Sequence, residues 1–218
     1  MTEPARIGVA TLTPARGATA SAGLMPPPRP RDETGTRSIL PEQPSGVAKL
    51  TPKARATEAA GRALRQVMGR FATGVTVVTT ADGDTIHGMT ANAFLSVSLT
   101  PPLVLVSLGR CRMAEMLPRT GRYGVSVLCD DQEDFAAHFA GQRASPVEPA
   151  FSWHDGFPFL DGALARLGCS VVDIHPAGDH VLWIGHVEHL DHRDGRPLLF
   201  FTGRFRTLRE IEQDNVQI

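Results

Sequence analysis

Several features that mark particular classes of protein are scarce or missing in this chain of 218 residues. Its net charge is −1, aromatic residues make up 6% of it, and its 22 lysines and arginines form no dense basic run. Nucleic acid is therefore not favoured as a partner. No apolar run approaches bilayer length, and the N-terminal segment has no uninterrupted apolar core. We therefore expect neither a membrane span nor a secretory signal.

Cysteine is also scarce. Cys111, Cys129 and Cys169 are an odd number of residues and lack CxxC spacing. This argues against a disulfide framework and against a zinc site, and it fits a reducing cytosol, so we expect a cytoplasmic protein. Cys169 lies in an apolar strand pattern and is most simply a small core residue.

The familiar catalytic motifs are missing as well. No GxGxxG follows a strand, and neither GxxxxGK(S/T) nor GxSxG occurs. This argues against a Rossmann dinucleotide site, a P-loop and a hydrolase nucleophile elbow. Histidine is instead frequent near the C-terminus, but its spacing matches no familiar ligand set, so ordinary polar histidines are favoured over a metal site. These residues are His175, His180, His186, His189 and His192.

The first quarter of the chain differs from the rest. Residues 1–53 hold nine of the 17 prolines and no Phe, Tyr or Trp. Such a segment cannot bury enough apolar surface to offset the entropy lost on ordering it. We predict a disordered, proline-rich extension over residues 1–55 and one globular domain over residues 56–218.

The globular part is predicted to contain strands in hairpin-like succession and few helices. A helix is predicted from Thr57 to Phe71, with Thr57 as its N-cap. The number and order of the strands favour a closed or partly closed antiparallel barrel. Predicted strands cover residues 75–80, 86–99, 103–108, 123–128, 163–175, 180–190 and 197–206; further helices cover 113–117 and 130–140, the latter capped by Asp130 or Asp131, and a loop covers 142–161.

The stretch from Gly88 to Leu108 organises the domain. Its first half alternates with a period of two, and Gly88 allows another group to approach the backbone closely. The apolar run from Leu103 to Leu108 is expected to be buried on both faces. One face of the first half is polar but uncharged, which suits a flat ligand rich in donors and acceptors; an ordinary solvent-facing surface explains it equally well. The polar face holds Thr90, Asn92, Phe94, Ser96 and Ser98, and the opposite face holds Ala91, Ala93, Leu95, Val97 and Leu99.

Two arginines follow the buried strand. Arg110 and Arg112 directly precede a short predicted helix. Cations beside a helix N-terminus favour anion binding, because the first N–H groups are unpaired and the helix dipole adds to the positive charge. The simpler interpretation is a solvated loop with ordinary arginines.

Taken together, these segments resemble the flavin reductase family, the small reductase components of two-component flavin-dependent monooxygenases. The resemblance covers roughly residues 60–209 and depends on the order of several motifs rather than on any single one. The motifs are FATGVTVVTT (71–80), GMTANAFLSVSLTPPLVLVSL (88–108), YGVSVL (123–128), HFAG (138–141), Cys169 in its strand, GDH (178–180) and PLLFFTGRF (197–205).

The resemblance implies an antiparallel split β-barrel of the Greek-key, FMN-binding type with a few peripheral helices. It also implies an NAD(P)H-dependent flavin reductase that passes a hydride from the nicotinamide to FMN or FAD, with NADH as the expected reductant. His180 and Phe205 are expected on the nicotinamide side, where His180 would orient or hydrogen-bond the nicotinamide. The flavin is expected to contact Thr90, Ala91, Asn92, Ser96, Val97 and Ser98, and its phosphate Ser107, Arg110 and Arg112.

The same resemblance implies a homodimer and a separate monooxygenase that receives the reduced flavin. Residues 143–151 depart from the family, which commonly has a charged residue and Phe after the FAG helix. Two other functions on this barrel stay open: a non-catalytic flavin-binding protein, and a flavin-bound oxidase or oxygenase, including a relative of the pyridoxamine-phosphate oxidases. The GDH motif and the aromatic last strand favour the reductase, because a passive binder needs no nicotinamide face.

Overall fold

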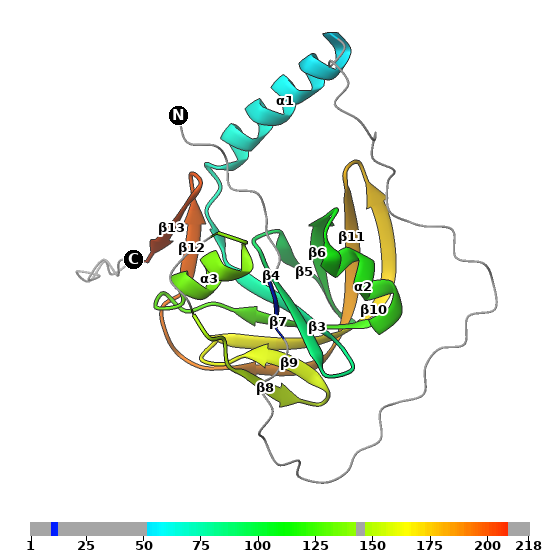
Figure 1. Ribbon diagram of the computed structural model, residues 1–218, viewed down its shortest axis with the longest axis vertical. Coiled ribbons are helices and arrows are strands. Elements are labelled where there is room, and N and C mark those ends of the chain that lie inside the picture. The colour runs from blue at the N-terminus through cyan, green and yellow to red at the C-terminus, as the bar shows by residue number, and fades with distance from the viewer. Residues whose placement is uncertain (1–9, 13–51, 143–146, 209–218) are drawn as a thin grey trace, which may run out of the picture.

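The computed structural model describes residues 10–12, 52–142 and 147–208. These residues form a mostly β structure (Figure 1). The strands are β1 (Ala10–Leu12), β2 (Thr73–Gly74), β3 (Thr76–Asp82), β4 (Thr85–Ala91), β5 (Phe94–Leu99), β6 (Pro102–Gly109), β7 (Arg122–Val127), β8 (Phe151–His154), β9 (Phe157–Leu160), β10 (Ala165–Ala177), β11 (His180–His192), β12 (Leu198–Phe201) and β13 (Arg204–Thr207). The helices are α1 (Pro52–Met68), α2 (Arg112–Thr120) and α3 (Glu133–Phe139).

All paired strands within this part of the chain are antiparallel. The large sheet has the order β1-β4-β3-β7-β10-β11-β6-β5, and the two small sheets have the orders β13-β12-β2 and β8-β9. Strands β10 and β11 are the longest, with 13 residues each. Their hairpin projects beyond the neighbouring strands, and α1 leads away from the sheets (Figure 1).

A two-residue connection between β4 and β5 forces the large sheet to curl. Strand β4 is second from one edge and β5 forms the other edge, yet only Asn92 and Ala93 separate them. Three Cα–Cα steps reach at most about 11 Å, whereas six strand spacings in a flat sheet span about 29 Å. The two edges must therefore approach each other, as in the predicted barrel. The N–H of Ser107 in β6 donates to the carbonyl of Ala93 at 3.0 Å and fixes this connection.

Two apolar clusters pack on opposite faces of β3. Val78 belongs to a cluster with Trp183 and Tyr123, which also includes residues of β4, β6 and α2. Val77 belongs to a second cluster, which joins α3, β9 and β12 and includes Phe139. The β-branched run of β3 is thus buried on both faces, which is why it lacks a polar alternation.

The expected core position of Cys169 is confirmed. Cys169 is fully buried, and burial raises its pKa to about 12. Cys111, Cys129 and Cys169 are all free thiols.

Two strand predictions are wrong, one in the extent of the strand and one in its burial. The predicted strand over residues 86–99 is two strands, because the chain crosses from one sheet edge to the other at Asn92 and Ala93. In β6, Val104 and Val106 are buried, but Leu103 and Leu105 are only half-buried. The outer face of β6 is therefore partly exposed in this chain, and burial on both faces was an overstatement.

Two hairpin turns were missed. Residues 151–160 of the predicted loop form the β8–β9 hairpin, which turns at Asp155 (φ 51°) and Gly156 (φ 79°). The predicted last strand is broken into β12 and β13 at Thr202 (φ 51°) and Gly203 (φ 77°). Two successive residues with positive φ match the two-residue turns whose twist suits a hairpin.

The helices also differ from the prediction at their starts. Helix α1 begins at Pro52, so Thr57 lies inside it, and α3 begins at Glu133 after Gln132 rather than after an aspartate cap. Apart from β1 and the start of α1, the predicted extension over residues 1–55 lies outside the described residues, as do residues 143–146. Within the described ranges, no helix has the length and apolarity needed to cross a membrane.

Candidate functional site

The pairing of β6 with β11 brings two predicted parts of the site together. His180, the first residue of β11, lies directly opposite Gly109, the last residue of β6. Its ring covers the Gly109 backbone, since a Cβ atom at Gly109 would lie 3.4 Å from the imidazole Nε2. The GDH turn therefore lies beside Gly109, where the loop that carries Arg110 and Arg112 begins.

The imidazole of His180 has a carboxylate partner. Its Nδ1 lies 2.8 Å from Oδ1 of Asp179, and the His180 side chain is 41% exposed. The hydrogen bond with His180, and then the positive charge of that ring, lower the pKa of Asp179. Asp179 enters the sequence prediction only as part of the GDH motif. Its place in a two-residue turn directly before the histidine is the sequence signal for this contact.

Positive charge gathers where β6 leads into α2. Arg110 and Arg112 are both exposed, and Arg112 is the first residue of α2. The positive charge of Arg112 acts on a buried histidine. Burial, and secondly Arg112, lower the pKa of the fully buried His87 in β4 to about 4. A surface with two arginines at a helix N-terminus is suited to a phosphate.

The β4–β5 connection lies beside this surface. Because the Ser107 N–H donates to Ala93, the exposed Asn92 is held next to the strand that leads to the arginines. Ser107 itself is half-buried and pairs with Leu182 of β11. Asn92, Ser107, Arg110 and His180 thus come from three separate segments of the chain and meet around one end of β6.

Thr90 does not share a free polar face with these residues. Its hydroxyl donates to the carbonyl of Ala136 in α3 at 2.7 Å. Thr90 therefore joins β4 to α3, and its hydroxyl proton is already used within the protein. Ala91, the next residue, is buried, so only its backbone is available to a ligand.

The remaining polar residues of the predicted face lie on β5. Ser96 is exposed, and Ser98 is half-buried and accepts a hydrogen bond from the Thr100 N–H at 3.2 Å. The β5–β6 register shifts between Ser96 and Ser98, and Val97 in the shift is 46% exposed. The predicted alternation therefore does not continue unbroken from β4 into β5.

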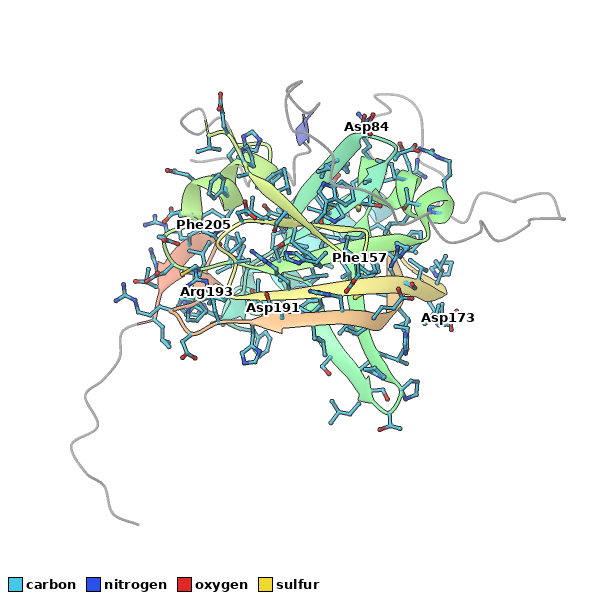
Figure 2. The ribbon with its side chains drawn as sticks, turned by 90° about the horizontal axis from the view of Figure 1, so that it is seen from below. Asp84, Phe157, Asp173, Asp191, Arg193 and Phe205 are labelled. Atoms are coloured by element: carbon cyan, nitrogen blue, oxygen red, sulfur yellow. The ribbon has the colours of Figure 1, made fainter. Side chains whose placement is uncertain are left out.

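Phe205 lies in a different sheet from His180. It forms an edge-on ring pair with Phe200 at 5.6 Å and packs against the cluster that contains Ala136 of α3. In Figure 2, Phe205 lies on the opposite side of the molecule from Asp173 of the β10–β11 hairpin. Within the described residues, no hydrogen bond, ion pair or ring contact joins Phe205 to His180.

The histidine-rich hairpin uses its side chains for other contacts. His175 pairs with Asp173 at 2.9 Å, and His189 pairs with Asp155 at 2.8 Å and stacks on His154. In the part of the chain that the structure describes, one group has metal-ligand spacing, and it contains no histidine. That group is Cys129, Asp130 and Asp131, of which Asp130 already pairs with Arg196 at 2.8 Å.

A cavity of about 220 Å³ lies at the other end of the β10–β11 hairpin from His180. It is lined by residues 162–166 and 191–193. In Figure 2, Asp191 and Arg193 lie to the left of Asp173, toward the side of the molecule that holds Phe205. None of the predicted site residues lines this cavity, so it is separate from the surface around His180.

Comparisons with known proteins identify the family of this chain. Residues 68–209 match the model of the flavin reductase like domain. The chain belongs to the flavin reductase family. A relative from Rhodococcus sp, an NADH-dependent flavin reductase, is 54% identical over 155 residues, which cover 69% of this chain and 88% of the relative.

Two solved structures of the family have the same fold. The flavin reductase PheA2 is 46% identical, with a TM-score of 0.67 over 68% of this chain and 98% of that chain. The styrene monooxygenase flavin reductase from Pseudomonas putida S12 is 39% identical, with a TM-score of 0.64 over 68% of this chain and 98% of that chain. The predicted family, mainly β fold class and enzyme class are confirmed.

Proposed function

We propose that this protein oxidises NADH and reduces FMN or FAD, and that it supplies the reduced flavin to a separate monooxygenase. Its family membership supports the reaction class, and the styrene monooxygenase flavin reductase supports a partner oxygenase. One structural observation supports the proposed site: His180 lies against Gly109, the residue that precedes Arg110 and leads to Arg112 at the start of α2.

The residues fit a flavin phosphate on one side of this surface. Arg112 is an exposed cation at the first residue of α2, Arg110 is an exposed cation two residues earlier, and the half-buried Ser107 provides a hydroxyl two residues before Gly109. These groups would bind the phosphate of FMN or the proximal phosphate of FAD. Gly109 has no side chain, which leaves room for the ring of His180.

The isoalloxazine would lie along the β4–β5 connection. Asn92 is exposed there, and Ser96 and Val97 are exposed on the following strand. We propose that these residues, with the backbone of Ala91 and the hydroxyl of Ser98, hold the edge of the ring. Thr90 would contribute by holding α3, since its hydroxyl donates to Ala136.

The nicotinamide would lie on the His180 side. When both are bound, the nicotinamide supplies a hydride and the flavin accepts it. The chain then needs to hold two flat rings in contact and to orient them, and it needs no nucleophile. We propose that His180 orients the nicotinamide and that Phe205 covers it. Because Phe205 lies on another sheet, it would reach the nicotinamide either by a movement of the β12–β13 hairpin or from a second subunit.

A homodimer is supported by an exposed apolar surface on the large sheet. On the edge strand β5, Leu95 is 51% exposed. Leu95 pairs with the half-buried Leu105, which pairs with the half-buried Ile184, so these apolar residues form one row across three strands. Exposed apolar patches of this kind mark interaction sites. We propose that a second copy of the chain covers this row.

The domain division and the compartment are also proposals. The family match over residues 68–209 lies inside the predicted domain of residues 56–218 and leaves the predicted extension outside it. Three free cysteines fit the reducing cytosol, where we propose that the protein acts.

The test of this function is NADH oxidation by the purified full chain with free FMN or FAD in large excess. Many turnovers per chain would support a reductase that uses flavin as a substrate, and the two rates would give the flavin preference. No turnover with tight retention of one flavin per chain would instead favour a flavin-bound oxidase or a non-catalytic flavin-binding protein. No turnover and no binding would contradict the site around Gly109.

A further inference from the structure

The turn between β10 and β11 places a carboxylate beside His180. Ala177 pairs with His180, so Gly178 and Asp179 form a two-residue loop. Gly178 has a φ of 66°, which glycine adopts at little cost. Asp179 occupies the second loop position, where its side chain reaches the ring of the next residue.

The hydrogen-bond roles in this pair follow from the charge of Asp179. The pKa of Asp179 is lowered, first by the hydrogen bond with His180, then by that ring's charge, and further by Arg65 of α1. Its carboxylate is therefore ionised near neutral pH and can only accept hydrogen bonds. The Nδ1 atom of His180, 2.8 Å away, must then carry the proton.

The other nitrogen of the ring lies toward the proposed site. Nε2 is the His180 atom nearest to the position of a Cβ on Gly109, and Gly109 leads directly into the arginine loop. In a neutral imidazole whose Nδ1 carries the proton, Nε2 is an acceptor. A reduced nicotinamide carries a carboxamide whose N–H groups are donors.

We propose that Asp179 is a positioning residue, which holds the proton of His180 on Nδ1 so that Nε2 accepts a hydrogen bond from the carboxamide of the nicotinamide. The inference rests on the proposed function, in which His180 lies on the nicotinamide side. Asp179 thus acts through His180 and contributes to recognition of the reductant rather than of the flavin.

The protonation of His180 can be measured directly. ¹⁵N NMR of the imidazole nitrogens in the full chain, with His180→Gln to assign the signal, distinguishes a protonated from a bare nitrogen. For neutral His180 we expect a protonated Nδ1 in the wild type. In Asp179→Asn we expect the proton to shift toward Nε2, because the amide can donate to Nδ1. Asp173→Asn is the matched control: it removes a carboxylate that pairs with His175 at 2.9 Å on the same hairpin.

Kinetics test the consequence for the reductant. Asp179→Asn should raise the KM for NADH about threefold to tenfold, the effect of one weakened hydrogen bond, and leave the KM for the flavin unchanged. Asp179→Glu should restore part of the loss. A reduced dinucleotide with an acetyl group in place of the carboxamide lacks the donor, so Asp179→Asn should discriminate less than the wild type between NADH and this analogue. Asp173→Asn should behave as the wild type does.

The outcomes separate this inference from the proposed function. If the wild type turns over NADH but Asp179→Asn keeps both the Nδ1 proton and the KM for NADH, the role of Asp179 is overturned and the reductase stands. A bare Nδ1 in the neutral wild-type ring would also overturn it. No turnover by the wild type with either flavin would overturn the proposed function, and this inference with it.

Discussion

The ring of Phe139 in α3 lies so close to Gly88 in β4 that a Cβ atom at position 88 would come within 2.8 Å of it. Both residues are buried, and Phe139 belongs to the cluster between α3 and β3. The close approach that the sequence predicted at Gly88 is thus made by a side chain of the protein itself. It lets α3 lie close to β4, where Thr90 also bonds to it.

Replacing Gly88 with alanine should lower the free energy of unfolding by about 1–3 kcal/mol, because the ring must move to avoid the new methyl group. Urea unfolding of both proteins measures this change. The matched control is Gly74→Ala in β2, where no described atom lies within 4 Å of the added Cβ. Gly74→Ala should change the stability by less than about 1 kcal/mol. Equal effects of the two substitutions would contradict this account.

The buried His87 should make stability depend on pH. Its pKa is about 4 in the folded chain against 6.5 in the unfolded one. Between these values the unfolded chain binds more protons, so stability is fully present above pH 6.5 and is lost as the pH falls toward 4. The loss should be of the order of 3 kcal/mol. Unfolding in urea at several pH values checks it.

The control for this pH dependence is a pair of variants. His87→Gln should flatten the dependence between pH 6.5 and 4, whereas His192→Gln at an exposed position should leave it as in the wild type. If the wild type and His87→Gln lost stability in parallel over this range, His87 would not be the titrating group.

The arginines beside α2 should bind the flavin through its phosphate. Arg110→Ala and Arg112→Ala should each raise the KM for FMN about tenfold, the effect of one lost charged hydrogen bond. Neither should change the KM for riboflavin, which has no phosphate. Arg119→Ala, which removes an exposed arginine paired with Asp82 at 3.1 Å, is the control. Equal losses for FMN and riboflavin would place the arginines elsewhere than at the phosphate.

The apolar row on the large sheet should hold two copies together. Leu95→Lys should convert a dimer to a monomer in sedimentation velocity, because burying an unpaired ammonium group in the interface is costly. Leu190→Lys changes another apolar residue that is 69% exposed and should leave the dimer intact. A wild-type chain that sediments as a monomer would rule out this interface.

Much of the fold could be predicted because local patterns determine it. The Asp82-Gly83 turn, the β-branched run of β3 and the hairpin at Gly178 each depend on neighbouring residues. The same Asp-Gly signal at Asp155 and Gly156 was missed, because the prolines and aromatic residues around it suggested a loop. The split between β4 and β5 could not be read from alternation, because it depends on where the sheet closes.

Some candidate site residues could likewise be suggested from short motifs, whereas contacts between distant segments could not. The resemblance suggested His180, Arg110 and Arg112 as candidates, and strand pairing places His180 opposite Gly109, the residue before Arg110. The hydrogen bond of Thr90 to Ala136 joins residues that are distant in sequence, so period-two alternation could only suggest a free polar face. The position of Phe205, on a separate sheet, depends on packing that no short motif encodes.

The pairing of His180 with Gly109 also has a consequence for folding. The β10–β11 hairpin closes between residues three apart, whereas Gly109 and His180 are about 70 residues apart, and distant pairings form late because a long loop must first be closed. The surface proposed to bind flavin and nicotinamide is thus absent from any partly folded chain that has formed only its local hairpins. Ligands that bind there act on the completed fold alone and stabilise it by mass action.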